Sequence, residues 1–282
     1  MLGTGGTEAI ALVTAYAIAA LATPAGVSGA VLLLPFQVSV LGTPSPAVTP
    51  TNLLYNVIAT PGALYRYWRQ GQSGGRLSVV LIAGTLPGVV VGSIIRVRLL
   101  PGPRVFDLVV AAVLVPLGMW LAVTRPPGQP APPGPADEDR PVRRGRGVRG
   151  VRGVRGVRAP ALVALAAIVG CAGGIYGIGG GSILAPILIG SGRRPAEVAP
   201  AALASTLVTS AAGVITFTVL SLHQPGSVAP DWPTGIALGA GGLAGGYTGA
   251  RLQSRLPDAP IRRLIGIMVV AIGARYLWSG LA

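Results

Sequence analysis

The sequence predicts an all-α polytopic membrane protein with eight transmembrane helices, arranged as two repeated four-helix units with a broken first helix in each unit. Of the 282 residues, 51% are hydrophobic and 11% are charged, and the mean hydropathy is +0.66. A soluble domain of this size is rarely so apolar. Nearly uncharged stretches of ~20 residues or more recur along the chain, which is the length that crosses a ~30 Å hydrocarbon layer as a helix. Besides composition and apolar stretches, the first and second halves of the sequence repeat each other.

Apolar runs and helix breakers together define the expected membrane segments. These lie at 8–41, 46–65, 76–98, 104–123, 160–190, 196–221, 233–254 and 260–281. A polar region separates the first four segments from the last four. The expected domains are therefore a first transmembrane unit at 1–124, a linker at 125–158 and a second transmembrane unit at 159–282.

The linker begins with a Pro-rich run and ends in an Arg-Gly-rich repeat, a composition that cannot build a core and predicts disorder. It carries nine arginines against three acidic residues. It could be a solvated tether, or it could contact anionic lipid headgroups if it is cytoplasmic. RNA binding is not expected, because aromatic residues do not alternate with the arginines. The net charge of +14 is explained by arginines in loops, and we expect the linker and both termini to be cytoplasmic.

The two halves repeat each other at nearly constant offsets. Gly26 and Pro35 align with Gly177 and Pro186 at an offset of 151 (177 − 26 = 151). Six further positions align at an offset of 157: Gly84, Gly88, Gly92, Arg98, Leu99 and Pro103 with Gly241, Gly245, Gly249, Arg255, Leu256 and Pro260. With four crossings per half, the two copies are expected to run in the same direction, whereas a re-entrant half-crossing in each copy would invert them.

The first segment of each unit is too long for a single crossing. Segments 8–41 and 160–190 each exceed 30 residues and would measure ~45–50 Å as straight helices. Glycines and prolines near their middles predict breaks, which are tolerated at membrane depth only where they face protein or a wet cavity. The start of a half-helix there offers unpaired N–H groups to an anion. For the glycines spaced by four at Gly84 and Gly241, close helix packing is the expected role.

Hydroxyl and amide side chains follow each break and share a helical face. Any single Ser or Thr can instead bond to its own helix, so both roles remain open. The expected substrate-binding residues are Gly26, Ser28, Gly29, Thr51, Asn52, Asn56, Gly177, Gly179, Gly180, Gly181, Ser182, Ser205, Thr206 and Thr209. If Gly180 lines the site, Gly180→Ala is expected to reduce transport more than stability.

The run Gly177 to Gly181, followed by Pro186-Ile187-Leu188, Pro195 and Ala204-Ser205-Thr206, resembles the signature of the TauE/SafE sulfite-exporter-like permeases. The resemblance covers both halves outside the linker. It implies a duplicated four-helix unit that moves sulfite, sulfonates or other small sulfur-containing or organic anions. The first half departs from the pattern at Ser28 and Ala30, where the glycine run would be fuller.

The expected function is therefore transport of a small anion through the plasma membrane by a multi-pass permease, in the direction of export. A scaffold that acts through its basic linker is the alternative, followed by a membrane-embedded enzyme. An enzyme would need a nucleophile, base or metal set, and the chain has one histidine, His223, and one cysteine, Cys171. We expect no enzymatic activity, no cofactor, no metal and no nucleic-acid partner, only the small anionic substrate and the lipid bilayer.

Overall fold

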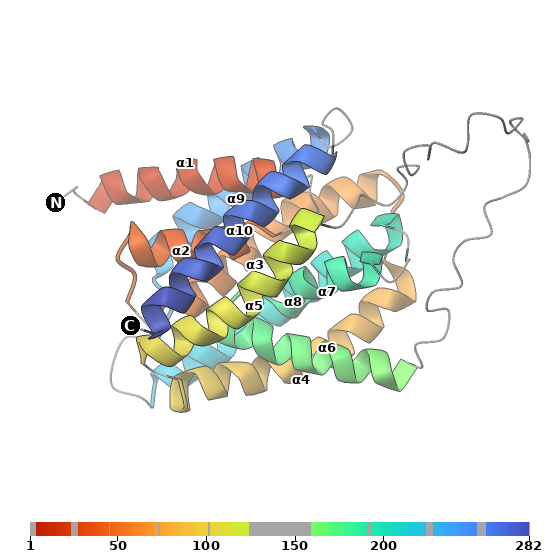
Figure 1. The fold of residues 1–282 in the computed structure, drawn as a ribbon. Coiled ribbons are helices and arrows are strands. Elements are labelled where there is room, and N and C mark those ends of the chain that lie inside the picture. Colours follow the sequence, from red (N-terminus) through yellow and green to blue (C-terminus); the bar gives the residue numbers. More distant parts are fainter. Residues whose placement is uncertain are drawn as a thin grey trace, which may run out of the picture.

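The computed structural model describes residues 4–23, 28–44, 46–72, 74–100, 102–123, 159–190, 193, 195–223, 228–252 and 258–281. Within these ranges every regular element is a helix, as Figure 1 shows. The helices are α1 (Thr4–Ala22), α2 (Ala30–Ser39), α3 (Val48–Arg69), α4 (Gly75–Arg98), α5 (Pro103–Val123), α6 (Ala159–Tyr176), α7 (Gly180–Gly190), α8 (Pro195–Ser221), α9 (Trp232–Leu252) and α10 (Asp258–Leu281). The linker expected at 125–158 lies outside the described residues.

Both over-long segments are broken, as the sequence predicts. The segment at 8–41 divides into α1 and α2, and the segment at 160–190 divides into α6 and α7. Gly177 and Gly179 have φ angles of 84° and 72°, a left-handed conformation that residues with a Cβ rarely adopt. Gly26, the corresponding position of the first half, lies outside the described residues. The chain therefore forms ten described helices where eight segments were expected.

Glycines spaced by four let pairs of helices approach closely, which confirms the packing role expected for them. Gly241, Gly245 and Gly249 of α9 face the backbone carbonyls of Leu12, Tyr16 and Ala20 in α1. Gly84, Gly88 and Gly92 of α4 face the backbone of α6 in the same way, from Val163 to Cys171. Residue numbers rise together in both contacts, so each pair of helices runs parallel.

Corresponding helices of the two halves run in opposite directions. Gly118 of α5 packs against Val270 of α10, whereas Gly280 of α10 packs against Leu108 of α5. The numbers rise in one helix as they fall in the other, so α5 and α10 are antiparallel. The expectation that the two copies run in the same direction is therefore wrong. Each break turns the chain back, which adds a reversal that an unbroken first crossing would lack.

The reversals are visible in the contacts of the short helices. Ser28 and Ala30 approach Asn56 and Asn52 of α3, so α2 runs antiparallel to α3. Likewise, Gly179 lies near Thr206 of α8 and Gly181 lies near Ala202, so α7 runs antiparallel to α8. Both turns therefore lie beside the interior of a longer helix, not at its end.

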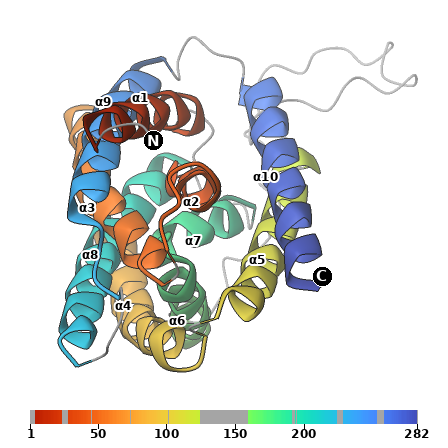
Figure 2. The same ribbon diagram turned by 90° about the vertical axis from the view of Figure 1, so that its left-hand side faces the viewer.

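Most helix contacts have a counterpart related by the repeat. The contact between α1 and α9 corresponds to that between α6 and α4, the contact between α3 and α9 to that between α8 and α4, and the contact between α2 and α3 to that between α7 and α8. In two further contacts, α3 with α8 and α5 with α10, each helix packs against its own counterpart. Figure 2 shows α5 and α10 together on one side and α2 and α7 near the centre. The first helix of each half thus packs mainly against the other half, and the site between α2 and α7 is built from both.

The outward faces of the helices are apolar. Val91 of α4, Ile215 of α8 and Ile236 of α9 are more than half exposed, which suits contact with lipid better than with water. Two described helices are both long and apolar enough to span a membrane, Gly75–Arg98 and Glu197–Ser221. Four shorter apolar helices lie at Gly6–Ala22, Ala30–Ser39, Pro160–Tyr176 and Gly266–Leu281.

Candidate functional site

The turn between α6 and α7 is held by the start of α3. The carbonyl oxygen of Ile175 in the last turn of α6 accepts a hydrogen bond from Thr49 Oγ1 at 3.2 Å. A helix end leaves such carbonyls without an intrahelical partner, so Thr49 supplies the missing donor. Gly177 packs against the backbone of Thr49, where an added Cβ would lie 2.6 Å from the carbonyl oxygen. The positive φ and this close approach together explain the glycine.

The start of α2 is held by amides of α2 and α3. Asn52 Nδ2 donates a hydrogen bond to the Ala30 carbonyl at 3.0 Å, and Gln37 Nε2 donates to Asn52 Oδ1 at 3.1 Å. Ser28, one residue before the N-cap Gly29, accepts a hydrogen bond through Oγ from the Ala30 N–H at 3.3 Å. These bonds fix the N-terminus of α2 beside α3.

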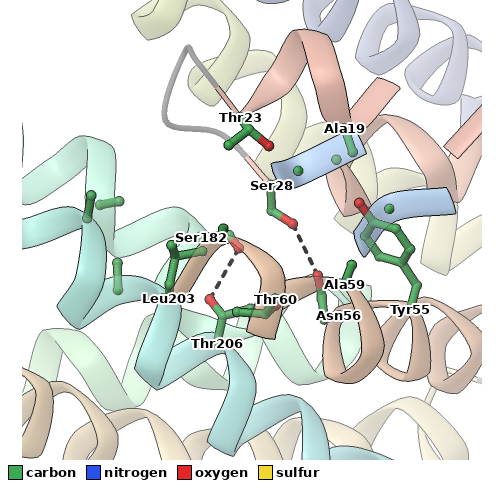
Figure 3. A pocket seen from close by; sticks show the side chains of 18 of the residues that line it. Ala19, Thr23, Ser28, Tyr55, Asn56, Ala59, Thr60, Ser182, Leu203 and Thr206 are labelled. Atoms are coloured by element: carbon green, nitrogen blue, oxygen red, sulfur yellow. Dashed lines mark hydrogen bonds between the residues drawn. The ribbon is translucent and has the colours of Figure 1, made fainter. Parts of the chain in front are cut away.

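A cavity lies between the N-termini of α2 and α7, and Figure 3 shows it from close by. It leaves about 70 Å³ for the centres of water-sized molecules, whereas one water needs roughly 10–15 Å³ on that measure. Residues from both halves line it: Ala19, Thr23, Ser28, Gly29, Tyr55, Asn56, Ala59, Thr60, Ala63, Tyr67, Gly181, Ser182, Ala185, Ala199, Ala202, Leu203, Thr206, Gly242 and Gly246. It therefore has room for a ligand larger than one water.

Each half contributes one polar pair to the cavity wall, and Figure 3 marks both with dashed lines. Ser28 Oγ donates to Asn56 Oδ1 at 3.1 Å, and the hydroxyls of Ser182 and Thr206 lie 3.4 Å apart. Asn56 is 1% exposed, and its Nδ2 atom has no hydrogen-bond partner among the described residues. A buried donor without a partner is costly, so a ligand that accepts a hydrogen bond would stabilise this wall.

The cavity also receives the starts of two helices. Ser28 and Gly29 precede α2, Gly181 and Ser182 belong to the first turn of α7, and all four line the cavity. The first turn of a helix carries a partial positive charge. In α2 the Ala30 and Val31 N–H groups already bond to Ser28, so this helix end offers its dipole to the cavity and not free donors. Two such ends from opposite halves therefore make the cavity suited to an anion.

Six of the expected site residues line this cavity, namely Ser28, Gly29, Asn56, Gly181, Ser182 and Thr206. Their binding of a ligand stays a prediction. Gly26 lies outside the described residues. Tyr55 and Thr60 belong to the hydroxyl and amide side chains that follow the first break, and they also line the cavity, although they were not among the expected binding residues. The helical spacing of Thr60 from Asn56, four residues on, supports its place on the same face.

The other expected site residues form packing contacts and bonds away from the cavity lining. Thr51 Oγ1 accepts a hydrogen bond from the Asp231 N–H at 2.9 Å, near the start of α9. Ser205 Oγ lies 2.8 Å from Thr85 Oγ1, and Thr209 Oγ1 donates to the Ser205 carbonyl of its own helix at 2.6 Å. Asn52, Gly177 and Gly179 shape the two turns, as described above.

Gly180 faces protein, which changes what its substitution can test. A Cβ at Gly180 would lie 2.7 Å from Thr85 Cγ2 and 3.1 Å from the Cα of Gly170. Gly180→Ala would therefore disturb packing between α7, α4 and α6, so a loss of transport in this variant would not separate binding from stability. Gly181 lines the cavity, but a Cβ there would overlap the Ala202 carbonyl oxygen. Both glycines are required for close packing.

Arg96 is the polar residue whose position the sequence least suggests. It lies near the end of the expected segment at 76–98, yet it is 0% exposed. Its guanidinium carbon lies 4.0 Å from the centre of the Phe106 ring, and the group donates hydrogen bonds to Thr49 Oγ1 and the Leu100 carbonyl. In the sequence, Arg96 stands near the end of an apolar segment and looks like an arginine at the membrane surface. Only the fold reveals that α3 and α5 cover it.

Three comparisons relate the chain to known proteins. A family model described as "Sulfite exporter TauE/SafE" matches residues 11–276. Two proteins, each named "Probable membrane transporter protein", from Xylella fastidiosa strains Temecula1 and 9a5c, are 30% identical over 111 residues. The match covers 39% of this chain and 40% of each relative. No solved structure matches the chain.

Proposed function

The chain belongs to the sulfite exporter TauE/SafE family, and we propose that it carries a small anion through the plasma membrane. The observation that carries the proposal is the convergence of two half-helix N-termini, from α2 and α7, on one cavity. Half-helix ends at the interface of two inverted repeats are a recurrent way in which transporters hold anionic groups.

In the proposed topology, α3, α4, α5, α8, α9 and α10 cross the bilayer. The α1–α2 and α6–α7 hairpins then enter from opposite sides and meet near mid-membrane. Non-helical backbone at that depth is tolerated because it is covered by protein and lines a cavity. Two inverted units around one site can expose that site to either side in turn by moving against each other.

The proposed substrate is sulfite, a sulfonate or a related small sulfur-containing or organic anion. The described cavity wall offers neutral donors, such as Asn56 Nδ2 and the Thr206 hydroxyl, beside methyl groups such as Ala59 and Ala202. Such donors can replace part of the hydration that an anion loses in a low-dielectric site. Export is the proposed direction, because a monovalent anion leaving a cell that is negative inside gains ~2.3 kcal/mol per 100 mV.

The distribution of arginines favours a cytoplasmic linker. Helix directions put seven described arginine positions near the bundle end where α5 ends and α6 begins: Arg66, Arg69, Arg76, Arg193, Arg251, Arg262 and Arg263. The opposite end has four, Arg96, Arg98, Arg104 and Arg275, and Arg96 is buried. The sequence between α5 and α6 contains nine more arginines. The positive-inside rule then assigns the linker to the cytoplasm. The helix directions put the start of α1 and the end of α10 at the opposite end of the bundle, so the expectation that both termini share the side of the linker is wrong.

Proteoliposome flux tests this function. Purified protein should increase efflux of at least one of sulfite, thiosulfate, taurine or a short carboxylate over protein-free vesicles, and the Asn56→Ala variant should reduce that efflux. Loss of residues 125–158 should leave the flux intact, whereas a scaffold that acts through its basic linker would lose its function. Wild-type flux of every tested anion in Asn56→Ala would place the site elsewhere.

A further inference from the structure

A second concave surface lies on the outside of the bundle, at its arginine-rich end. This groove measures about 330 Å³ and is formed by the last turns of α3, the start of α4 and the start of α8. Its lining residues are Leu64, Tyr65, Trp68, Gln72, Gly74, Ser78, Pro200 and Ala204. None of them lines the cavity between α2 and α7, so the groove is a separate site.

The walls of the groove are apolar and aromatic. Tyr65 and Trp68 are 50% and 71% exposed, and their ring centres lie 6.1 Å apart. Aromatic side chains of this kind gather where the hydrocarbon layer meets the headgroups. Because α3 ends at Arg69, directly after Trp68, we expect the groove to lie at the boundary between the hydrocarbon layer and the headgroups.

Arginines border the groove. The guanidinium carbon of Arg69 lies 6.0 Å from the centre of the Tyr65 ring, so this cation sits beside a residue of the groove wall. Arg76, two residues beyond Gly74, is exposed. The rim therefore presents the positive charges of Arg69 and Arg76 above an apolar floor.

We propose that this groove binds an acidic phospholipid, with an acyl chain against Leu64, Trp68 and Pro200 and the phosphate near Arg69. A soluble anion would leave the apolar floor uncovered, and a zwitterionic lipid would complement the arginines less well. Basic pockets between membrane helices on the cytoplasmic side are suited to anionic headgroups. The site differs from the linker because it is formed by folded helices. Lipid binding at this site requires a bilayer but does not depend on the proposed transport function.

Trp68 provides a direct probe of this lipid. In proteoliposomes, dibrominated phosphatidylglycerol or dibrominated phosphatidylcholine would be mixed with unbrominated phosphatidylcholine, and tryptophan fluorescence would be measured. The chain has four tryptophans, so the difference between wild type and Trp68→Phe isolates Trp68. Dibrominated phosphatidylglycerol should quench Trp68 at several-fold lower mole fraction than dibrominated phosphatidylcholine.

The Arg69→Gln variant should lose about five-fold of this preference, the ratio that corresponds to ~1 kcal/mol for one basic residue near the lipid surface. Arg98→Gln is the matched control, because Arg98 is an exposed arginine at the opposite end of the bundle, and it should keep the preference. Three results would overturn the proposal: equal quenching of wild-type Trp68 by both lipids, an equal loss in Arg98→Gln, or no quenching of Trp68 by either lipid, which would mean that protein covers the groove.

Discussion

The Nε atom of Arg96 lies 3.4 Å from the Oγ1 atom of Thr49, in the interior of the bundle. Thr49 Oγ1 in turn donates to the Ile175 carbonyl at the end of α6. A buried cation therefore stands near the negative end of a helix dipole, where positive charge is stabilising. Through Thr49, the arginine of α4 helps to hold the turn that leads into α7.

The first prediction concerns Arg96. Arg96→Gln should lower the free energy of unfolding by ~3 kcal/mol, because it removes a buried charge whose interactions include the Phe106 ring and the Asp107 charge. Arg96→Lys should recover only part of this, because an ammonium lacks the planar fork of guanidinium. Unfolding in detergent, followed by circular dichroism, measures both. Arg98→Gln, two residues along α4 and exposed, is the control, and equal melting of all three variants would contradict the prediction.

The second prediction concerns Asn56. Asn56→Ala removes the unpartnered Nδ2 donor of the cavity wall, and a hydrogen bond to a charged group contributes about 1.5–3 kcal/mol. The KM for the transported anion should therefore rise by roughly 10-fold or more. Asn56→Asp should abolish transport, because it replaces the donor with a negative charge. Initial rates in proteoliposomes measure both effects.

Thr218→Ala is a suitable control for Asn56, because its Oγ1 donates to the Val214 carbonyl of its own helix and Thr218 lines neither pocket. An unchanged KM in Asn56→Ala, together with normal melting, would show that the amide does not contact the anion.

The fold was predictable to the extent that local patterns determine it. Glycines spaced by four predicted close packing at Gly84 and Gly241, and the structure confirms it. The spacing gives a face of a helix but not its partner, which proves to be the first helix of the opposite half. The breaks were also predictable, because an apolar segment of more than 30 residues with central glycines cannot cross as one helix. The reversal of chain direction after each break was not predictable, because it depends on the contacts of α2 with α3 and of α7 with α8.

The site was predictable only as a neighbourhood. Helical spacing places Asn52 and Asn56 on one face, but Asn52 is engaged by Gln37 and the Ala30 carbonyl, so only Asn56 lines the cavity. Ser205 and Thr206 are adjacent in sequence and point to different partners, Thr85 and Ser182. Which hydroxyl is free depends on the neighbouring helix, and a single sequence does not contain that information.

The third prediction concerns the second polar pair. Thr206→Val keeps the size of the side chain but removes the hydroxyl that lies 3.4 Å from Ser182 Oγ. If the anion contacts both halves, Thr206→Val and Ser28→Ala should each raise KM several-fold. The Ser28→Ala/Thr206→Val double variant should show nearly the product of the two effects, because distant independent sites are additive. A double variant no worse than either single one would mean that the two pairs do not bind the same anion independently.

The last prediction uses two adjacent glycines of α9 that differ in what surrounds them. Gly246 lines the cavity, and the nearest atom that an added Cβ would meet is Thr23 Oγ1, at 3.7 Å. A Cβ at Gly245 would instead overlap the backbone carbonyl oxygen of Tyr16 in α1. Replacing Gly by Ala in a helix is favourable by up to ~1 kcal/mol where space exists. Gly246→Ala should therefore melt at or slightly above the wild-type temperature, whereas Gly245→Ala should melt well below it because α1 and α9 must separate.

The same methyl group at Gly246 projects into a cavity of only about 70 Å³. It should exclude larger anions before smaller ones, so Gly246→Ala should reduce taurine flux by a larger factor than sulfite flux, while Gly245→Ala should reduce both in proportion to the folded protein that remains. Melting temperatures and the ratio of the two fluxes, measured on the same preparations, separate these cases. An unchanged flux ratio in a stable Gly246→Ala variant would mean that the transported anion does not pass through this cavity.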